Sequence, residues 1–457
     1  MEAMAEYELK LDAPEGFELP DLGGEPLETR VFTSVYYDTA DRSLTGAGLT
    51  LRRRTERGRS VWQLKLPAGD ARLELEEPGG PAGPPEALAR LLTAHLRHGG
   101  FTPVAELRTR RHGALVARNG TTAEVTVDDV AVMDARRVVE EFVEVEIELR
   151  DGTPKSLAAI AKAIERAGAR RSEGTPKLFR VLHVTADAGD DREALPTLQR
   201  RLHTQLRAIL ANDPGTRLGR DPESLHDMRV AVRRTRALFR AGAVLYTDDV
   251  TGLEDELRWL GEKLGAVRDL DVLVERLRRS LDELDADDRA TGRALVQTLE
   301  RRRRGSRASL LRALAGARYL TLLDRLQTTI DGLRPSGAET TLGRLAGHQL
   351  AKLRKRVRST PDDPADDELH ALRKRGKRVR YAFELAGNDA VVKRAKAFQD
   401  VLGEHQDSVV AEATLREIAT PATASAAGRL VEREHEARAE ARASWRKAWK
   451  RLKRAAR

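Results

Sequence analysis

The sequence contains no cysteine, which excludes disulfide bonds, cysteine-ligated metal sites and a cysteine nucleophile. It also lacks long apolar runs, since no stretch approaches the roughly 18 apolar residues of a membrane-spanning helix. The opening residues, MEAMAEYELK, have neither the basic start nor the apolar segment of a secretion signal. We therefore expect a soluble, cytoplasmic protein with no membrane partner.

Aromatic residues are scarce, at 4% of the chain, whereas charged residues make up 33%. The net charge of +9 is unevenly distributed. Residues 1–185 carry a net charge of −4, and residues 186–457 carry a net charge of +13. This asymmetry indicates that the second part of the chain binds an anion.

Residues 1–185 alternate between polar and apolar side chains, with the period of two that is typical of β-strands. The alternation is clearest in EYELKL (6–11), VFTSVYY (31–37), LTLRRR (49–54), SVWQLKL (60–66), ARLELE (71–76), AEVTVDD (123–129) and FVEVEIEL (142–149). Many short strands within one domain favour a sandwich or a closed barrel. Helices are expected there only near residues 84–96 and 154–167.

Beyond residues 185–196 the apolar pattern becomes helical and remains so almost to the end. About ten helices are expected, separated by segments rich in proline, glycine and aspartate. The sequence therefore predicts a multidomain α+β protein. An antiparallel β domain would cover residues 1–185, and an all-α domain would cover residues 195–457.

One basic helix occurs twice in the predicted all-α domain. HDMRVAVRRTRALFR covers residues 226–240, and HALRKRGKRVRYAFE covers residues 370–384. At 100° per residue, each segment gathers its cations on one stripe beside an apolar stripe. The two basic stripes contain His226, Arg229, Arg233, Arg236 and Arg240, and His370, Arg373, Lys377 and Arg380. Like charges this close repel one another, so each stripe is expected to need a counter-anion.

A second motif follows each basic helix. LGAVRDLDVL (264–273) aligns with LGEHQDSVVA (402–411), and the two share Leu-Gly and the aspartates Asp269 and Asp407. Two motifs in the same order at nearly the same separation indicate an internal duplication. We call residues 226–240 with 264–273 the first copy, and residues 370–384 with 402–411 the second copy. The alternative interpretation is that each stripe is only a solvated helix face.

The composition of the stripes favours phosphate as their ligand. Arginine presents a planar, permanently charged fork that suits phosphate oxygens. A row of such side chains along about 20 Å of helix suits a linear chain of phosphates. Nucleic acid is the rival, but proteins that grip single strands usually add aromatic platforms for the bases. No aromatic residue alternates with the stripes, so a polyanion without bases is favoured over nucleic acid.

The helical part resembles the CHAD domain, a module with recurrent histidines and basic residues. The resemblance covers residues 195–455 and is carried by HDMRVAVRRTR, LGAVRDLDVL and HALRKRGKRVRYAFE. It implies two pseudo-symmetric helical bundles that bind inorganic polyphosphate. It also indicates polyphosphate granules as a partner of the protein. The polyphosphate ligands that it implies are His226, Arg229, Arg233, Arg236, His370, Arg373, Lys377 and Arg380.

Charged residues share one face of several predicted strands in residues 1–185. These faces contain Glu6, Glu8, Lys10, Arg52, Arg54, Lys65, Glu144, Glu146 and Glu148. The three late glutamates stand close together on one strand, so cations are needed to offset their repulsion. Mg²⁺ or Mn²⁺ would do so, because hard divalent ions prefer carboxylate oxygen. Carboxylates, metal ions and basic residues inside a small barrel would suit a triphosphate.

The order of these motifs resembles the CYTH family, the triphosphate tunnel metalloenzymes. ExExK (6–10) is followed by YYDTADRSL (36–44), LRRR (51–54), WQLKLP (62–67) and EVEIEL (144–149). The resemblance covers residues 1–185. It implies an antiparallel eight-stranded β-barrel whose tunnel holds a triphosphate substrate and a divalent metal, Mg²⁺ or Mn²⁺.

The resemblance also implies roles for individual residues. The catalytic residues would be Glu6, Glu8 and Lys10. The phosphates would be bound by Lys10, Arg52, Arg54, Lys65, Arg111, Lys177 and Arg180. The metal would be bound by Glu6, Glu8 and a subset of Glu144, Glu146 and Glu148, whose register the sequence leaves open. The general base is not identified, and a metal-bound water oriented by a glutamate is the favoured arrangement.

We therefore predict an enzyme, a metal-dependent inorganic triphosphatase, fused to a domain that binds inorganic polyphosphate. Two alternatives stay open. An adenylate cyclase or a thiamine triphosphatase would use the same tunnel for a different substrate. A non-catalytic protein would use both domains only to dock on polyphosphate granules.

Overall fold

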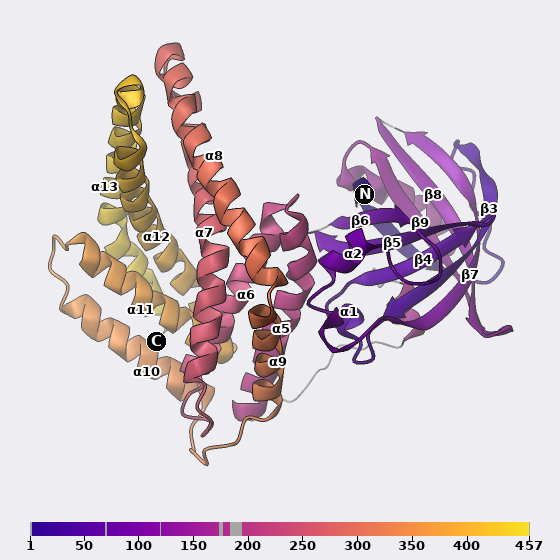
Figure 1. Cartoon of the computed structure of the whole chain (residues 1–457), viewed down its shortest axis with the longest axis horizontal. Helices are drawn as coiled ribbons and strands as arrows, with labels where there is room; N and C mark the ends of the chain where they lie inside the picture. The colour runs from indigo at the N-terminus through magenta and orange to yellow at the C-terminus, as the bar shows by residue number, and fades with distance from the viewer. Residues whose placement is uncertain (1, 69–70, 119, 173–176, 183–193, 457) are drawn as a thin grey trace. The chain divides into compact units, whose positions relative to one another are not determined.

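The computed structural model describes residues 2–68, 71–118, 120–172, 177–182 and 194–456. The chain divides into two compact units, Met1–Ala188 with Leu210–Leu225, and Gly189–Ile209 with His226–Arg457. The first unit contains the described β-sheet, and the second is built from α-helices (Figure 1).

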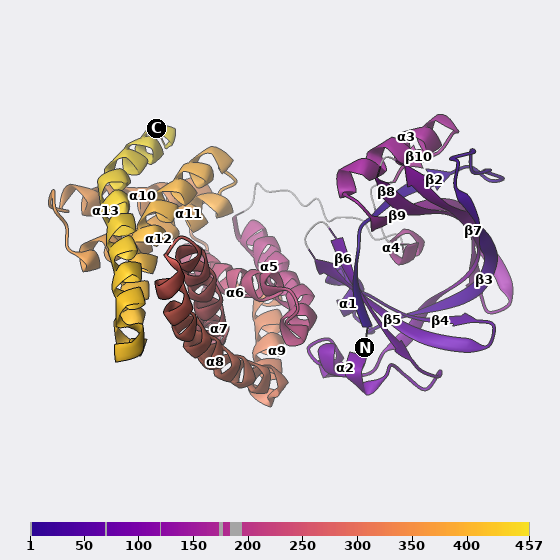
Figure 2. The same ribbon diagram turned by 90° about the horizontal axis from the view of Figure 1, so that it is seen from above.

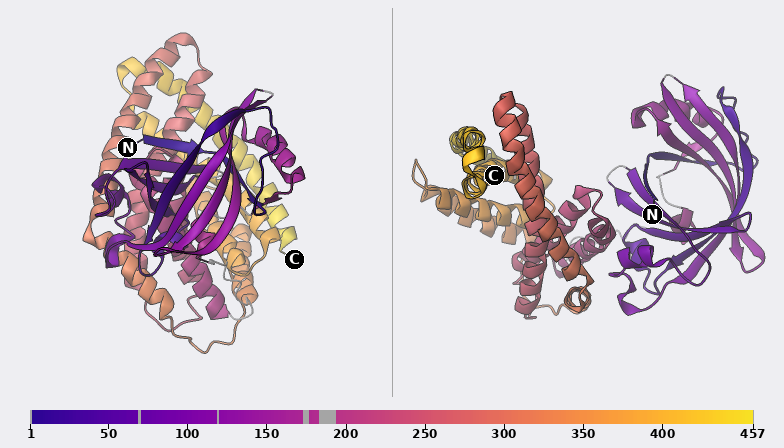
Figure 3. Two further views of the ribbon diagram at one scale, coloured as in Figure 1. Left: turned by 90° about the vertical axis from the view of Figure 1, so that its right-hand side faces the viewer. Right: turned by 45° about the horizontal axis from the view of Figure 1, so that its top comes forward.

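A strongly curved antiparallel sheet of ten strands forms the first unit (Figure 2; Figure 3, right). The strands follow the spatial order β1-β6-β5-β4-β3-β7-β8-β9-β2-β10. Their bounds are β1 Glu2–Glu6, β2 Glu8–Ala13, β3 Glu25–Asp38, β4 Thr50–Glu56, β5 Arg59–Ala68, β6 Ala71–Pro78, β7 Thr102–Arg118, β8 Thr121–Asp134, β9 Arg137–Asp151 and β10 Arg170–Arg171. The helices of this unit include α1 Ser43–Gly46, α2 Glu86–Leu91, α3 Leu157–Arg166 and α4 Lys177–Val181.

The strand predicted over residues 6–11 is interrupted at Tyr7. Before this residue β1 pairs with β6, and after it β2 pairs with β9, so that Glu8 lies opposite Glu148. The carbonyl of Tyr7 accepts a hydrogen bond from the backbone N–H of Leu149 at 2.9 Å. One continuous stretch of chain therefore joins the two sides of the sheet.

Strict alternation sorts the side chains of β2, β8 and β9 between two faces. Leu11, Val125, Val145 and Ile147 are fully buried in a cluster that includes the apolar side of α3. Full burial of each such side chain stabilises the fold by about 1.5–3 kcal/mol. Their neighbours in sequence, including Lys10, face the interior of the curved sheet.

Helix α4 packs against the inner face of the sheet, and Figure 2 shows it within the curve of the strands. Its residue Leu178 is buried in one cluster with Tyr36, Leu107 and Phe142. This anchoring holds Lys177, the first residue of α4, in a buried position inside the sheet.

The described chain from residue 194 onward forms nine α-helices. They are α5 Ala194–Leu218, α6 Pro222–Ala241, α7 Thr251–Asp282, α8 Ala286–Ala315, α9 Ala317–Asp331, α10 Leu342–Arg358, α11 Asp366–Leu385, α12 Asp389–Ile418 and α13 Ala424–Ala455. One apolar cluster joins α7, α8, α12 and α13, and another joins α10, α11, α12 and α13. The two basic helices are α6 and α11, and the motifs that follow them lie in α7 and α12.

The predicted fold class is confirmed, since an antiparallel β unit precedes a helical one. The strand count differs, because the break at Tyr7 separates β1 from β2 and the short β10 pairs with β2. The nine α-helices of the described part agree with the expected number of about ten. The pseudo-symmetry of the helical halves stays a prediction. None of the described helices combines the length and the apolar character needed to cross a bilayer.

Candidate functional site

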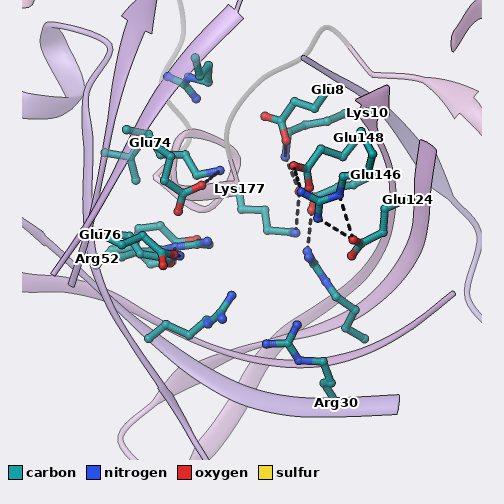
Figure 4. A pocket seen from close by; sticks show the side chains of 18 residues that line it. Glu8, Lys10, Arg30, Arg52, Glu74, Glu76, Glu124, Glu146, Glu148 and Lys177 are labelled. Carbon is teal, nitrogen blue, oxygen red and sulfur yellow. Dashed lines mark hydrogen bonds and ion pairs between the residues drawn. The ribbon is translucent and has the colours of Figure 1, made fainter. Parts of the chain in front are cut away.

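A cavity of about 240 Å³ lies inside the curved sheet (Figure 4). Eight strands and α4 contribute side chains to it, and nearly all of them are charged. The lining residues are Glu8, Lys10, Arg30, Tyr36, Thr50, Arg52, Arg54, Gln63, Lys65, Arg72, Glu74, Glu76, Arg111, Glu124, Glu146, Glu148, Arg150 and Lys177. A cavity with this lining attracts a ligand that carries several negative charges together with cations that can meet the carboxylates.

Three carboxylates form a row across neighbouring strands on one wall of the cavity. Glu148 of β9 lies opposite both Glu8 of β2 and Glu124 of β8 in the strand register. Arg150 bridges two of them, with nitrogens 2.5 Å from Glu124 and 2.8 Å from Glu148. Burial and the nearby charge of Glu124 raise the pKa of Glu148, although Arg150 acts in the opposite direction. This wall therefore carries negative charge that the protein compensates only in part.

A buried ion network lies beside the carboxylate row. Lys10 Nζ lies 2.5 Å from Glu146 and 3.2 Å from Glu144. Lys177 Nζ lies 2.5 Å from Asp128 and 3.0 Å from each of the same two glutamates. Arg111 completes the network, with Nη2 2.6 Å from Asp128 and 2.5 Å from Glu146. Three cations and three carboxylates thus neutralise one another inside the protein.

The network shifts the pKa values of its members in ways that follow from burial and charge. Burial acts to raise the pKa of Glu146, but Lys10, Lys177 and Arg111 hold it well below its usual range. Burial instead raises the pKa of Glu144, which the two lysines only partly oppose. Burial also disfavours charged Lys10, yet the surrounding glutamates raise its pKa well above normal. The lysines of the network therefore remain protonated at neutral pH.

The opposite wall is cationic and comes from β4 and β5. Arg52 Nε donates to Gln63 Oε1 at 2.7 Å, and Arg52 Nη1 donates to the Tyr36 hydroxyl at 3.2 Å. Gln63 Nε2 in turn donates to the Glu76 carboxylate, which fixes the orientation of its amide. Burial and the neighbouring guanidinium of Arg52 lower the pKa of Arg54. Cations that are crowded in this way gain from the arrival of an anion.

A second cavity, of about 410 Å³, lies in the helical unit and is lined by both copies of the basic helix. We call it the basic pocket. Its charged and polar lining comes from α6, α7, α11 and α12, and consists of His226, Arg229, Arg233, Arg268, Asp269, Arg276, Arg373, Lys377, Gln406 and Asp407. Residues 144 positions apart in sequence thus meet in one site.

The cations of the basic pocket are only partly compensated. Burial and the charges of Arg373, Arg233 and Arg229 lower the pKa of Lys377 to about 7. Burial likewise lowers the pKa of Arg373, whose buried Nε has no hydrogen-bond partner in the described part of the chain. Leaving a buried donor unpaired costs about 1–3 kcal/mol. A bound anion would supply the missing acceptor.

Comparison with known proteins assigns a domain family to each part of the chain. The model of the CYTH domain matches residues 4–175, and that of the CHAD domain matches residues 200–416. The uncharacterized protein Rv2226 of Mycobacterium tuberculosis is 33% identical over 453 residues, which cover 89% of this chain and 87% of that protein. The chain belongs to the CYTH–CHAD family.

Solved structures resemble the two domains separately. The CHAD domain from the plant Ricinus communis is 31% identical, with a TM-score of 0.49, and covers 59% of this chain and 94% of its own. HpAC1 from Hippeastrum, described as an adenylyl cyclase candidate with a dominant triphosphatase activity, is 16% identical with a TM-score of 0.28. That match covers 40% of this chain and 98% of HpAC1. The family assignment rests on the domain matches and the mycobacterial relative.

Most of the residues predicted for the CYTH domain line its cavity. They are Glu8, Lys10, Arg52, Arg54, Lys65, Arg111, Glu146, Glu148 and Lys177. Glu144 does not line it, because its carboxylate is buried between Lys10 and Lys177. Glu6 is the last residue of β1, and its side chain lies outside the described residues.

Arg180 is not among the residues that line the CYTH cavity, and its role in phosphate binding stays a prediction. Its Nη1 lies 2.7 Å from Asp12, and its guanidinium stacks over the Phe142 ring at 4.2 Å. The side chain is anchored there by charge and by packing, and it ties α4 to β2 and β9.

Several cavity residues escaped the sequence prediction. Glu124 belongs to the carboxylate row, Arg150 bridges it to Glu148, and Arg30 and Gln63 also line the cavity. Glu124 belongs to the alternating run AEVTVDD, so the alternation contained a signal for it. Its alignment with Glu148 depends on the pairing of β8 with β9, which the sequence alone does not supply.

The carboxylate row has the donor chemistry of a divalent metal site. CYTH domains are metal-dependent, and carboxylate oxygens are the ligands that Mg²⁺ and Mn²⁺ prefer. Glu8 and Glu148 fit this role best, because Glu146 is already held by three cations. Within the described residues, no group of three such side chains is yet close enough to enclose an ion.

The CHAD residues predicted from the two stripes divide into two groups. His226, Arg229, Arg233, Arg373 and Lys377 line the basic pocket, and Arg236 lines an adjoining cavity. His370 and Arg380 line neither of these cavities. Arg380 lies 3.2 Å from Glu384 and stacks over the Tyr381 ring at 4.6 Å, so an acidic and an aromatic neighbour occupy it.

Proposed function

We propose that the CYTH domain hydrolyses inorganic triphosphate to diphosphate and phosphate with the help of a divalent metal, and that the CHAD domain binds inorganic polyphosphate. Members of the CYTH family act on triphosphates as phosphatases or cyclases. The observation that carries the proposal is the cavity itself, in which a cationic wall faces a carboxylate row within the curve of one sheet.

The cationic wall and the carboxylate row would have different roles in phosphoryl transfer. Arg52, Arg54 and Lys65 would bind and orient the phosphate oxygens, because guanidinium and ammonium groups neutralise their charge and fix their position. The fixed orientation of Gln63 between Glu76 and Arg52 would hold the Arg52 guanidinium toward the substrate. A divalent metal held by Glu8 and Glu148 would supply further neutralisation of the phosphates.

The lining of the cavity favours inorganic triphosphate over a nucleotide. Tyr36 is the single aromatic residue among those that line it. Its side chain is buried, and the Arg52 guanidinium lies over its ring at 5.9 Å from the centroid, so the described lining offers little aromatic surface to a base. A cyclase or a thiamine triphosphatase needs to hold an organic group as well as phosphates. The charged lining offers such a group little to contact.

The decisive experiment for the CYTH domain compares substrates. Phosphate release from inorganic triphosphate, ATP, thiamine triphosphate and long polyphosphate would be measured with Mg²⁺ and with Mn²⁺, and cyclic AMP would be measured in the ATP reaction. We expect inorganic triphosphate to give the highest kcat/KM. Preferential release of phosphate from thiamine triphosphate, or formation of cyclic AMP, would favour the corresponding alternative. No turnover of any substrate would favour the granule-docking alternative.

The proposal for the CHAD domain rests on the meeting of the two copies in one basic pocket. Five predicted ligand residues from α6 and α11 line it, and the buried Nε of Arg373 lacks a partner in the described structure. Aromatic platforms for bases are missing from the pocket lining, which favours polyphosphate over single-stranded nucleic acid. Association of the protein with polyphosphate granules would follow from such binding.

Paired substitutions test the CHAD proposal. Arg229→Ala with Arg233→Ala removes two cations of the first copy, and Arg373→Ala with Lys377→Ala removes two of the second. Each pair should weaken polyphosphate binding and flatten its dependence on salt, because fewer counterions are released. Single-stranded DNA of matched charge should bind more weakly than polyphosphate at equal salt. Tighter binding of DNA, or dependence on one copy alone, would contradict the proposal.

A further inference from the structure

The first basic stripe continues beyond the basic pocket. Arg236 lies seven residues after Arg229, which corresponds to about 10 Å along α6. It lines an adjoining cavity of about 490 Å³. The linings of both cavities include Arg229, Arg233 and Asp269, so the two cavities lie side by side along α6 and α7.

The pairing of α6 with α7 places a second arginine opposite Arg236. Gly265 of α7 lies against the guanidinium of Arg229, and Gly261 lies against Val232. Further along, Arg240 Nε lies 2.7 Å from Glu254. These contacts define an antiparallel register in which Arg258 faces Arg236, and both line the adjoining cavity.

The charges of this cavity are poorly compensated around Arg236. Its Nε is buried and has no hydrogen-bond partner within the described residues. Burial and the nearby charges of Arg240 and Arg258 lower its pKa. Arg258 pairs at the surface with Asp255 at 2.8 Å, and Glu262 also lines the cavity. An anion between the two guanidinium groups would provide Arg236 with an acceptor.

The second copy does not continue in the same way. Arg380 occupies the position equivalent to Arg236, but the position equivalent to Arg240 holds Glu384. Glu384 lies 3.2 Å from Arg380 and 3.5 Å from Arg234, so it neutralises the stripe where the first copy adds a cation. Lys396, the counterpart of Arg258, is exposed and lines neither cavity.

We propose that Arg236 and Arg258 form an additional phosphate subsite, which a polyphosphate chain reaches only when it extends beyond the basic pocket. A long chain then leaves the pocket over the first copy and not over the second. The inference rests on the proposed function of the CHAD domain. It predicts on which side of the basic pocket a long polyphosphate chain extends, and it predicts that affinity depends on chain length.

The test compares polyphosphate chains of two defined lengths, one short enough to be contained in the basic pocket and one several times longer. Affinities would be measured at several salt concentrations for the full-length protein, for Arg258→Ala and for Lys396→Ala. Lys396→Ala removes a cation at the matching position of the second copy and serves as the control. A third variant, Arg258→Lys, retains the charge.

We expect Arg258→Ala to lose roughly three- to tenfold in affinity for the long chain, with a shallower salt dependence, because one phosphate contact is removed. Binding of the short chain should be unchanged, Lys396→Ala should resemble the unmodified protein, and Arg258→Lys should restore most of the loss. Circular dichroism would establish that all variants are folded.

Three outcomes would overturn the subsite. They are an equal loss for both chain lengths, no loss for either, or the same loss in Lys396→Ala. These results leave binding by the unmodified protein intact, so they would not affect the proposed function. Failure of the unmodified protein to bind either chain would instead overturn the proposed function, and the subsite with it.

Discussion

Arg229 and Asp269 form an ion pair in the first copy, and Arg373 and Asp407 form its counterpart in the second. The nitrogen–oxygen distances are 2.6 Å and 4.0 Å. In each copy the glycine of the Leu-Gly motif lies against the arginine, so that the guanidinium fits between the helices. The duplicated motifs therefore encode the same structural unit twice. In each copy the basic helix, α6 or α11, supplies an arginine, and the helix that follows it, α7 or α12, supplies the aspartate that pairs with it.

This pairing predicts that neutralising a charged residue of the basic pocket increases the affinity for polyphosphate. In the absence of ligand, Asp269 compensates Arg229, but it also repels an incoming polyanion. We expect Asp269→Asn to increase polyphosphate affinity at low salt by roughly two- to fivefold, consistent with the small value of exposed ion pairs. Asp407→Asn should act in the same direction but less, since its pair is longer. A titration in which Asp269→Asn weakens binding would show that the aspartate orients Arg229 for the ligand instead.

Glu8 tests the assignment of the carboxylate row to catalysis. Glu8→Gln retains the size of the side chain and removes one negative charge from the predicted metal site. We expect kcat for triphosphate to fall roughly a hundredfold, as it does when metal coordination is impaired, and the metal requirement to shift to higher concentration. Thermal unfolding should change little. Glu15→Gln, on the exposed loop after β2, is the matched control, and unaltered metal dependence in Glu8→Gln would exclude Glu8 as a ligand.

Glu144 should behave differently, although it stands on the same strand face as Glu148. Its carboxylate compensates two buried lysines, Lys10 and Lys177. Glu144→Gln removes one partner from a buried ion network, which typically costs about 3–5 kcal/mol. Denaturant unfolding of this variant should reveal the loss directly. Normal stability together with lost activity would restore Glu144 as a candidate metal ligand.

Lys377 predicts a pH dependence of polyphosphate binding. Burial and the charges of Arg373, Arg233, Arg229 and Arg380 lower its pKa from 10.5 to about 7. A bound polyanion favours the charged form, so the complex has a higher pKa and takes up a proton on formation. Affinity should therefore be constant below pH 7 and fall as the pH rises above 7, by at most tenfold per pH unit for one proton.

Lys377 also makes the stability of the folded protein depend on pH, with the opposite sign to its effect on polyphosphate binding. Because the folded pKa of Lys377 lies below the unfolded value, the unfolded state binds more protons between pH 7 and pH 10.5. Stability should rise with pH across that window, and it should be lowest below pH 7, where the lysine is charged. Lys377→Met should remove both pH dependences. A binding profile that keeps its slope in this variant would assign the titration to another group.

Alternation in the strands was sufficient to identify much of the cavity, because side chains two residues apart share a face. It could not separate Glu144 from Glu148, since both lie on the same face of β9. What separates them is Lys177, which α4 brings against Glu144. Such contacts between distant segments are set by packing and carry no local pattern in the sequence.

More residues of the predicted stripe line the two adjoining cavities in α6 than in α11. The helical wheel placed Arg380 on the basic stripe, but Glu384 four residues later neutralises that end of the helix. This was a visible signal, because residues at i and i+4 are neighbours on a helix. Arg258 was not predictable from the wheel, since its place opposite Arg236 depends on how α7 packs against α6.

The interruption at Tyr7 has a consequence for how the CYTH domain is made. Lys10 and Glu146, which meet in the finished domain, are 136 residues apart in sequence. Pairings this distant are slow to form, because the intervening chain has to close into a large loop first. During synthesis, β2 therefore waits without its partner until β9 has left the ribosome. An unpaired strand is prone to join other chains, so aggregation of the nascent chain should compete with folding until β9 is available.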